Sequence, residues 1–282
     1  MADQSKRFED LAFTDDFMFC KVLSNNPDLC AEMTELILGR KVGEVIKISS
    51  QKPVEITDDG RGVRFDVYME DDESTVYNIE MQTGKVMNIP FRTRYYQGMI
   101  DLDQMERRAK FEDLKTTFII FICLDNPYPD IGLHKYTFFN TCAEAPHLEM
   151  GDGAYKVFLS TKGKQNDLSE NPNLNAFLKY VAGNVPASGF TSRLGAKVKE
   201  AREHKEWRKE YMTLLERDER MREEGRKEGL KEGREEGLKE GREEERKNTR
   251  REAARADAAV EELARVRAKL AAYEKKNGTN SP

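Results

Sequence analysis

Two carboxylates and one amide, Asp66, Glu80 and Gln82, stand in the stretch of the chain best suited to chemistry. The segments 62–70 and 76–82 alternate apolar and polar residues on either side of a polar turn, a pattern that predicts a β-hairpin. Side chains of a strand alternate between two faces, so the three polar side chains are expected on one face. The other face is expected to carry the apolar residues Phe65, Val67, Ile79 and Met81.

If the two strands pair antiparallel about Glu73, Asp66 lies directly opposite Glu80, with Cβ atoms about 4.5–5.5 Å apart. Like charges placed opposite each other repel, and a divalent cation shared by both carboxylates would remove the repulsion. The alternative is that both acids are ordinary solvent-facing strand residues.

The composition sets limits on the class of protein. The chain has 282 residues, of which 38% are hydrophobic and 35% charged, and a net charge of −5 argues against a generally basic nucleic-acid binder. The polar start predicts no secretory signal, and the longest apolar run, 118–124, is too short to span a membrane. The four cysteines lack C-x-x-C spacing, which predicts reduced, buried thiols in a cytoplasmic protein.

The predicted order of elements favours an α/β or α+β domain over residues 8–190, with a mixed central sheet flanked by helices. Helices are expected over 8–40, with a break at Asn26-Pro27-Asp28, and over 91–110 and 172–183. Besides the hairpin, strands are expected at 45–48, 116–124, 135–142 and 154–160, and an acidic loop at 57–62. The apolar, β-branched run at 116–124 is typical of a strand buried on both faces of a sheet.

The chain changes character near residue 192. Residues 192–248 are dominated by Glu, Lys, Arg and Gly, with a glycine at every fourth position from Gly225 to Gly241. Each Gly costs a helix about 1 kcal/mol relative to Ala, so this segment is expected to be a marginal helix or a flexible segment. A short helix over 252–276 carries apolar residues close to coiled-coil spacing, which favours a homo-oligomer. These residues are Val260, Leu263, Leu270 and Tyr273.

Several motifs together resemble a known family. They are "TDDFMFCKVL" near the start, "FDVYMEDDESTVYNIEMQ" in the hairpin, "RTRYYQGMIDL" in the next helix, and the "EGxxEGxxEG" repeat of the tail. The chain resembles the recombination-promoting nuclease / putative transposase family of the PD-(D/E)XK nucleases over roughly residues 8–245. This resemblance implies a restriction-endonuclease-like fold.

The resemblance also implies a metal site. Asp66, Glu80 and the Met81 carbonyl would bind Mg²⁺, or Mn²⁺, because hard cations prefer oxygen ligands. The metal would activate water and neutralise charge on the scissile phosphate of DNA. Asp16 is the motif match for an acid from the first helix that completes some sites of this kind.

The third catalytic position usually holds Lys, but in this chain it holds Gln82. Gln can orient a water molecule but brings no positive charge, and Lys85 is a nearby cation that could reach the site. Arg92 and Arg94 are expected to clamp phosphates at the edge of the cleft. The alternative for both arginines is a solvated helix face.

The function implied is that of a metal-dependent DNA endonuclease, which hydrolyses phosphodiester bonds and promotes recombination or acts in a mobile-element or defence context. One alternative is a catalytically impaired module that binds nucleic acid or protein and self-assembles through its C-terminal helix. A nuclease acting on RNA is the other.

Overall fold

The computed structural model describes residues 6–55, 62–85, 88–165 and 167–277, with side chains up to Glu274. It divides into two compact units, Met1–Met212 and Thr213–Pro282. The first unit holds a sheet with helices, and the second is a single helical segment. Most of the acidic loop expected at 57–62 lies outside the described residues.

A six-stranded mixed sheet forms the centre of the first unit, in the order β1-β2-β3-β4-β6-β5. The bounds are β1 Val45–Val54, β2 Val63–Asp71, β3 Thr75–Gln82, β4 Thr116–Cys123, β5 Lys135–Phe138 and β6 Ala154–Ser160. The pairs β3–β4 and β4–β6 are parallel, whereas the other neighbours are antiparallel. The predicted fold class, a mixed sheet flanked by helices, is confirmed.

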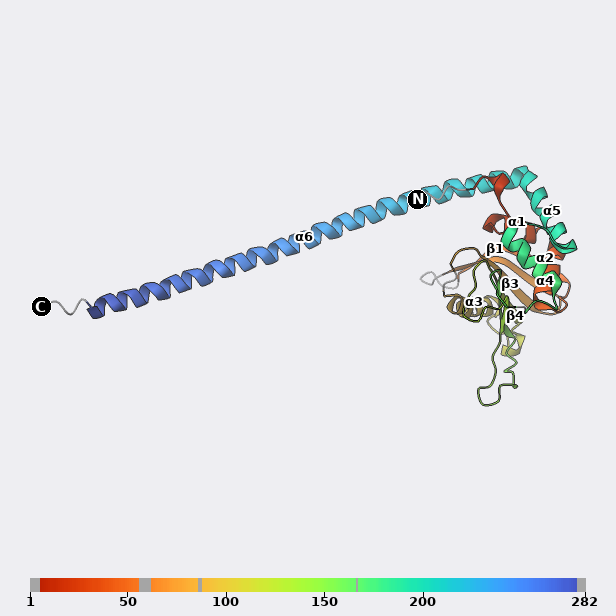
Figure 1. Ribbon diagram of the computed structural model, residues 1–282, viewed down its shortest axis with the longest axis horizontal. Coiled ribbons are helices and arrows are strands. Elements are labelled where there is room, and N and C mark those ends of the chain that lie inside the picture. The colour runs from red at the N-terminus through yellow and green to blue at the C-terminus, as the bar shows by residue number, and fades with distance from the viewer. Residues whose placement is uncertain (1–5, 56–61, 86–87, 166, 278–282) are drawn as a thin grey trace. The chain divides into compact units, whose positions relative to one another are not determined.

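Helices cover both faces of this sheet. They are α1 Asp16–Ser24, α2 Pro27–Leu38, α3 Ile89–Gln104, α4 Pro172–Gly183 and α5 Gly189–Glu203, and the chain ends in α6 Lys205–Asn277. Figure 1 shows α1, α2, α4 and α5 gathered on one side of the sheet and α3 on the other. Short 3₁₀ turns occupy Phe8–Asp10 and Phe111–Asp113. Among the described residues, no helix combines the length and apolar character needed to cross a membrane.

The sequence explains why β4 lies in the middle. Seven of its eight residues, from Thr117 to Cys123, are buried, because both of its faces are covered. On the face that carries α3, Phe121 packs against Phe158 of β6 and Tyr96 of α3. This apolar layer anchors α3 beside the ends of β2 and β3.

Several element ends differ from those predicted. The helix expected from residue 8 begins only at Asp16, because residues 8–10 form a separate 3₁₀ turn. β1 continues to Val54 because this edge strand pairs with β2 through its backbone, although half of its residues are polar. α3 ends at Gln104, because the next residue, Met105, has an extended backbone conformation. The charged residues that follow also provide no apolar stripe for a longer helix. β5 ends at Phe138, after which the chain folds into a turn closed by the Thr141–Glu149 bridge.

The predicted hairpin register is correct, but the strict alternation of its side chains is not. Val67 pairs with Ile79 and Glu70 with Val76, which centres the turn as expected. Phe65, however, packs against Tyr68 and Tyr96 on the face that carries α3. The prediction that Phe65 shares a face with Val67 is therefore wrong.

The break in alternation lies at Asp66. On the neighbouring strand, Ser50 pairs with Val67 and Lys52 with Phe65, and Gln51 between them has a positive φ of 51°. The break in alternation on β2 therefore coincides with an unusual backbone conformation at the neighbouring position of β1.

The core continues past the composition change near residue 192. Four apolar side chains of α5 are buried: Phe190, Leu194, Val198 and Ala201. The first turns of α6 also belong to this unit, since Tyr211 packs on Phe8 and Phe17. Sparse apolar residues at helical spacing therefore extend the compact unit to Met212.

Candidate active site

Asp66 and Glu80 lie side by side where β2 and β3 end their regular pairing. The backbone N–H of Asp66 donates to Glu80 Oε1 at 3.2 Å, and the backbone N–H of Met81 donates to Asp66 Oδ2 at 3.0 Å. Each carboxylate thus accepts a bond from the backbone of the other strand. Glu80 is only 3% exposed and Asp66 is half-buried, so neither is an ordinary solvent-facing strand residue.

The electrostatics of the pair are unfavourable for two negative charges. Burial, and then the neighbouring Asp66 carboxylate, raise the pKa of Glu80 above its usual range. Burial, and then Asp16, raise the pKa of Asp66. Withdrawal from water and repulsion by like charges both disfavour the ionised carboxylate. A bound cation would reverse this balance by favouring the ionised forms.

A third acid approaches from α1. One ligand atom each of Asp16, Cys20 and Asp66 lie within 4.8 Å of one another. The Cys20 thiol donates to the Asp66 carbonyl oxygen at 3.3 Å and lies 3.6 Å from Asp16 Oδ1. Because burial and the nearby acids raise the thiol pKa, Cys20 stays protonated and acts as a hydrogen-bond donor. The remaining ligands are carboxylate oxygens, a donor set that fits a hard divalent cation.

Gln82 faces the same edge of the sheet, but it contacts Arg92 of α3. Arg92 Nη1 donates to Gln82 Oε1 at 2.7 Å, and Nη2 lies 3.5 Å from Glu80 Oε2. The structure therefore brings Asp66, Glu80, Met81, Gln82 and Arg92 together, with Asp16 beside them.

The other predicted residues lie outside this cluster. Arg94 is exposed and its guanidinium lies 5.8 Å from the Phe91 ring. Lys85 is exposed and contributes its backbone carbonyl, which accepts a bond from the Gln82 amide at 3.4 Å. A groove of about 750 Å³ opens beside the cluster. It is lined by Gly62, Val63, Arg64, Asn88, Phe91, Arg92, Tyr95 and Tyr96.

Sequence reasoning missed Cys20, Tyr96 and Asn78 as neighbours of the acids. Cys20 stands four residues after Asp16, a spacing that puts both on one helix face and could have indicated their contact. Tyr96 lies four residues after Arg92 and accepts a bond from its Nη2 at 3.2 Å. Asn78 is fully buried two residues before Glu80, and its amide lies close enough to that carboxylate to offset part of the rise in the Glu80 pKa. No local signal in the sequence predicts that environment.

Residues 13–144 match a family model described as PD-(D/E)XK nuclease family transposase. The resemblance seen in the sequence is confirmed for this segment. The match contains the paired acids, Gln82 and Arg92, so the candidate site lies within the nuclease-like domain. No curated protein matches the chain, and no solved structure does. The description supports a nuclease- or transposase-like role, and divalent metal ions are the general cofactor of such nucleases.

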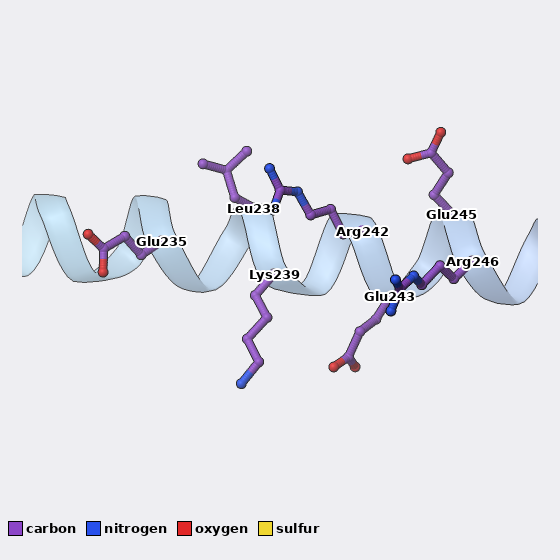
Figure 2. Close-up of a pocket in the computed structure, with 7 residues that line it drawn as sticks. All are labelled: Glu235, Leu238, Lys239, Arg242, Glu243, Glu245 and Arg246. Carbon is purple, nitrogen blue, oxygen red and sulfur yellow. The ribbon is translucent and has the colours of Figure 1, made fainter.

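A hollow on the second unit is not a comparable site. Figure 2 shows that its lining side chains project from one stretch of α6 in different directions. They are Glu235, Leu238, Lys239, Arg242, Glu243, Glu245 and Arg246. A single helix encloses no cavity, so these side chains form an open, mixed-charge surface.

Proposed function

We propose that the nuclease-like domain is a metal-dependent DNA endonuclease whose ion is held by Asp66 and Glu80. The observation that carries the proposal is the close pairing of these two acids away from water. Glu80 is 3% exposed and Asp66 is half-buried, and each carboxylate accepts a backbone hydrogen bond from the opposite strand. Buried like charges cost free energy, and a shared cation offsets that cost. Mg²⁺, or Mn²⁺, fits the oxygen donors.

The ligand roles follow from which atoms remain available. Each paired carboxylate has one oxygen bonded to a backbone N–H, which leaves the other oxygen for the ion. The Met81 carbonyl is the proposed third ligand, and Asp16 completes the acidic edge. The bound ion would supply Lewis-acid polarisation of the phosphate and of its attacking water. Cys20 fixes the position of this edge by donating to the Asp66 carbonyl.

The reaction is hydrolysis of a phosphodiester. The water oxygen forms a new bond to phosphorus, the bond from phosphorus to one sugar oxygen breaks, and that oxygen takes up a proton as the water loses one. The products are a phosphomonoester and a hydroxyl end. Water is the only co-reactant, so no oxidant or second substrate is required.

DNA binding is assigned to the groove beside the acids. Arg64 and Arg92 line it together with the exposed ring of Phe91, and Arg94 lies next to that ring. Arginine contacts to phosphates are sequence-independent and weaken as salt rises. The recombination or mobile-element role is proposed from the family description alone.

Self-association through α6 is part of the proposal. Val260, Leu263, Leu270 and Tyr273 are each more than half exposed on a helix with no other cover within the described residues. Their near-heptad spacing fits a second copy of the same helix.

One observation favours a binding module without catalysis, namely the neutral Gln82 at the position where a cation is expected. Incubating the full chain with supercoiled plasmid or a matched RNA transcript, in Mg²⁺, Mn²⁺, Ca²⁺ or EDTA, distinguishes the endonuclease from the binding module and from a ribonuclease. The endonuclease nicks plasmid in Mg²⁺ and not in EDTA. Gel-shift binding without nicking in Mg²⁺ or Mn²⁺ would support the binding module, and cleavage of RNA alone would support a ribonuclease.

A further inference from the structure

On β3, the position where a lysine is expected holds Gln82, whose amide is neutral. The paired acids therefore have no cationic neighbour on that strand. Negative charge grows on the phosphate oxygens during phosphodiester hydrolysis, and fixed cationic donors at that place lower the barrier. An amide is neutral and offers only hydrogen bonds. The positive charge must therefore come from another element.

Arg92 of α3 reaches this place through Gln82 itself. The bond from Arg92 Nη1 to Gln82 Oε1 is 2.7 Å long. Only the oxygen of an amide can accept from a guanidinium, so the amide nitrogen must point away. It donates to the carbonyl oxygens of Gly84 and Lys85, each at 3.4 Å. Gln82 is therefore held at both ends and presents a fixed acceptor to Arg92.

Three further contacts fix the guanidinium. Nη2 donates to the Tyr96 hydroxyl at 3.2 Å, and the guanidinium carbon lies 4.8 Å from the centre of the Phe121 ring. The 3.5 Å approach to Glu80 is longer than the 2.7–2.9 Å typical of a direct charge-assisted bond. Gln82, rather than Glu80, is thus the closest polar partner that positions Arg92.

The guanidinium also remains accessible to a substrate. The Arg92 side chain is 36% exposed and lines the groove beside the acids. Its fork carries five N–H donors, and the contacts to Gln82, Tyr96 and Glu80 do not use all of them. Donors therefore remain for an oxygen of a phosphate that lies next to Glu80.

We propose that Arg92 is the catalytic cation of this site and that Gln82 is the residue that positions it. Arg92 donates hydrogen bonds to a non-bridging oxygen of the scissile phosphate as negative charge develops there. It transfers no proton, because a guanidinium stays protonated throughout the accessible pH range. The inference rests on the proposed nuclease function and extends it, because it assigns the catalytic positive charge to a residue of α3 and not of β3.

A simple phosphate clamp would act differently. A clamp stabilises bound DNA and its transition state equally, so its loss raises the half-saturating concentration and leaves the maximal rate unchanged. A group that acts on developing charge lowers the maximal rate. Arg94, two residues further on α3 and outside the cluster, provides the matched comparison.

The test is single-turnover cleavage of a labelled DNA duplex by the full chain in Mg²⁺, over a range of protein concentrations. The variants are Arg92→Ala, Arg92→Lys, Arg94→Ala, Gln82→Lys and the double variant Gln82→Lys/Arg92→Ala. Thermal melting of each variant identifies those that fail to fold. Duplex affinity measured in Ca²⁺ gives a readout that does not depend on turnover.

Arg92→Ala is expected to lower the maximal rate by roughly 100-fold or more, with a much smaller loss of duplex affinity in Ca²⁺, because Arg64 and Arg94 also contact the DNA. Arg94→Ala should change mainly the affinity. The double variant should recover at least about tenfold of the lost rate, because the lysine restores a charge on β3. If Arg92→Ala changes affinity alone, or Gln82→Lys gives no recovery in a folded double variant, the inference is wrong while the nuclease function stands. If the wild-type chain shows no metal-dependent cleavage, both fall.

Discussion

The backbone N–H of Asp66 donates to Glu80 Oε1 at 3.2 Å, which places two carboxylates together at the ends of β2 and β3. The neighbouring strand is distorted at the same level, where Gln51 has a φ of 51°. An arrangement that keeps two acids in poor contact with water is costly in the metal-free protein.

Glu80→Gln is expected to raise the free energy of unfolding of the metal-free protein by about 1–2 kcal/mol at pH 8. The folded-state pKa of Glu80 lies above its unfolded value, so its favourable contribution exists at low pH and is lost as pH rises through the folded pKa. Gln avoids that loss, and the gain should shrink at pH 5. Urea unfolding in EDTA at the two pH values measures the difference.

The same variant should lose its response to metal. Mg²⁺ is expected to raise the melting temperature of the wild-type chain, more at pH 8 than at pH 5, because protons compete with the ion. The exposed Glu170→Gln serves as the control and should respond as the wild type does. An equal rise in Glu80→Gln would remove Glu80 from the metal ligands.

Glu70 belongs to a cluster of ion pairs on the same sheet but outside the candidate active site. It is 6% exposed and accepts from Lys115 at 2.5 Å and Lys47 at 2.9 Å. Burial alone would raise its pKa, but these lysines and the Tyr68 hydroxyl together lower it to about 2. The stabilisation is therefore present above the unfolded pKa and is lost as pH falls toward 2.

Glu70→Gln should lower the free energy of unfolding by about 1.5–3 kcal/mol at pH 7, since it removes two charge-assisted bonds. The difference from the wild type should be smaller at pH 3 in urea unfolding. Glu112→Gln, at an exposed position, is the matched control. A loss that is equal at both pH values would show that packing, and not charge, stabilises this position.

The glycine repeat predicts a weak helix in the second unit. A Cβ added at Gly225, Gly233 or Gly241 meets nothing within 4 Å. The triple replacement by Ala should stabilise α6 by about 1 kcal/mol per site and shift its melting upward in far-UV circular dichroism. Gly39→Ala is the contrasting control, because its φ of 73° disfavours a side chain. No shift in the triple variant would mean that a partner already stabilises this helix.

The end of α6 provides the test of self-association. Leu263→Lys/Leu270→Lys should lower the mass of the full chain measured by light scattering, because lysine at two apolar seam positions disrupts a coiled coil. Leu230→Lys, at an exposed position among the glycines, should leave the mass unchanged. A mass unaffected by the double variant would contradict assembly through 252–276.

Local patterns predicted the elements better than the contacts between them. The bounds of β6 and α4 agree with those expected, and the hairpin register is correct, because apolar periodicity and turn residues encode them. The break in alternation at Asp66 and the positive φ of Gln51 could not be predicted, since no glycine marks either position in the sequence. The approach of Arg92 to Gln82 was missed because it depends on how α3 lies against β4, a tertiary relationship that spacing along the chain does not carry.

The central claim is that Asp66 and Glu80 hold the ion that permits DNA cleavage. The most direct measurement is the rate of supercoiled plasmid nicking by Asp66→Asn across a Mg²⁺ titration, beside the wild-type chain and Asp103→Asn. Asp103 pairs with Lys52 at 2.6 Å on the same domain but outside the site, so Asp103→Asn controls for the loss of one acid. Asp66→Asn is expected to lose nicking by at least about 100-fold, while it stays folded and Asp103→Asn stays active. Undiminished nicking by Asp66→Asn, or nicking that persists in EDTA, would contradict the account.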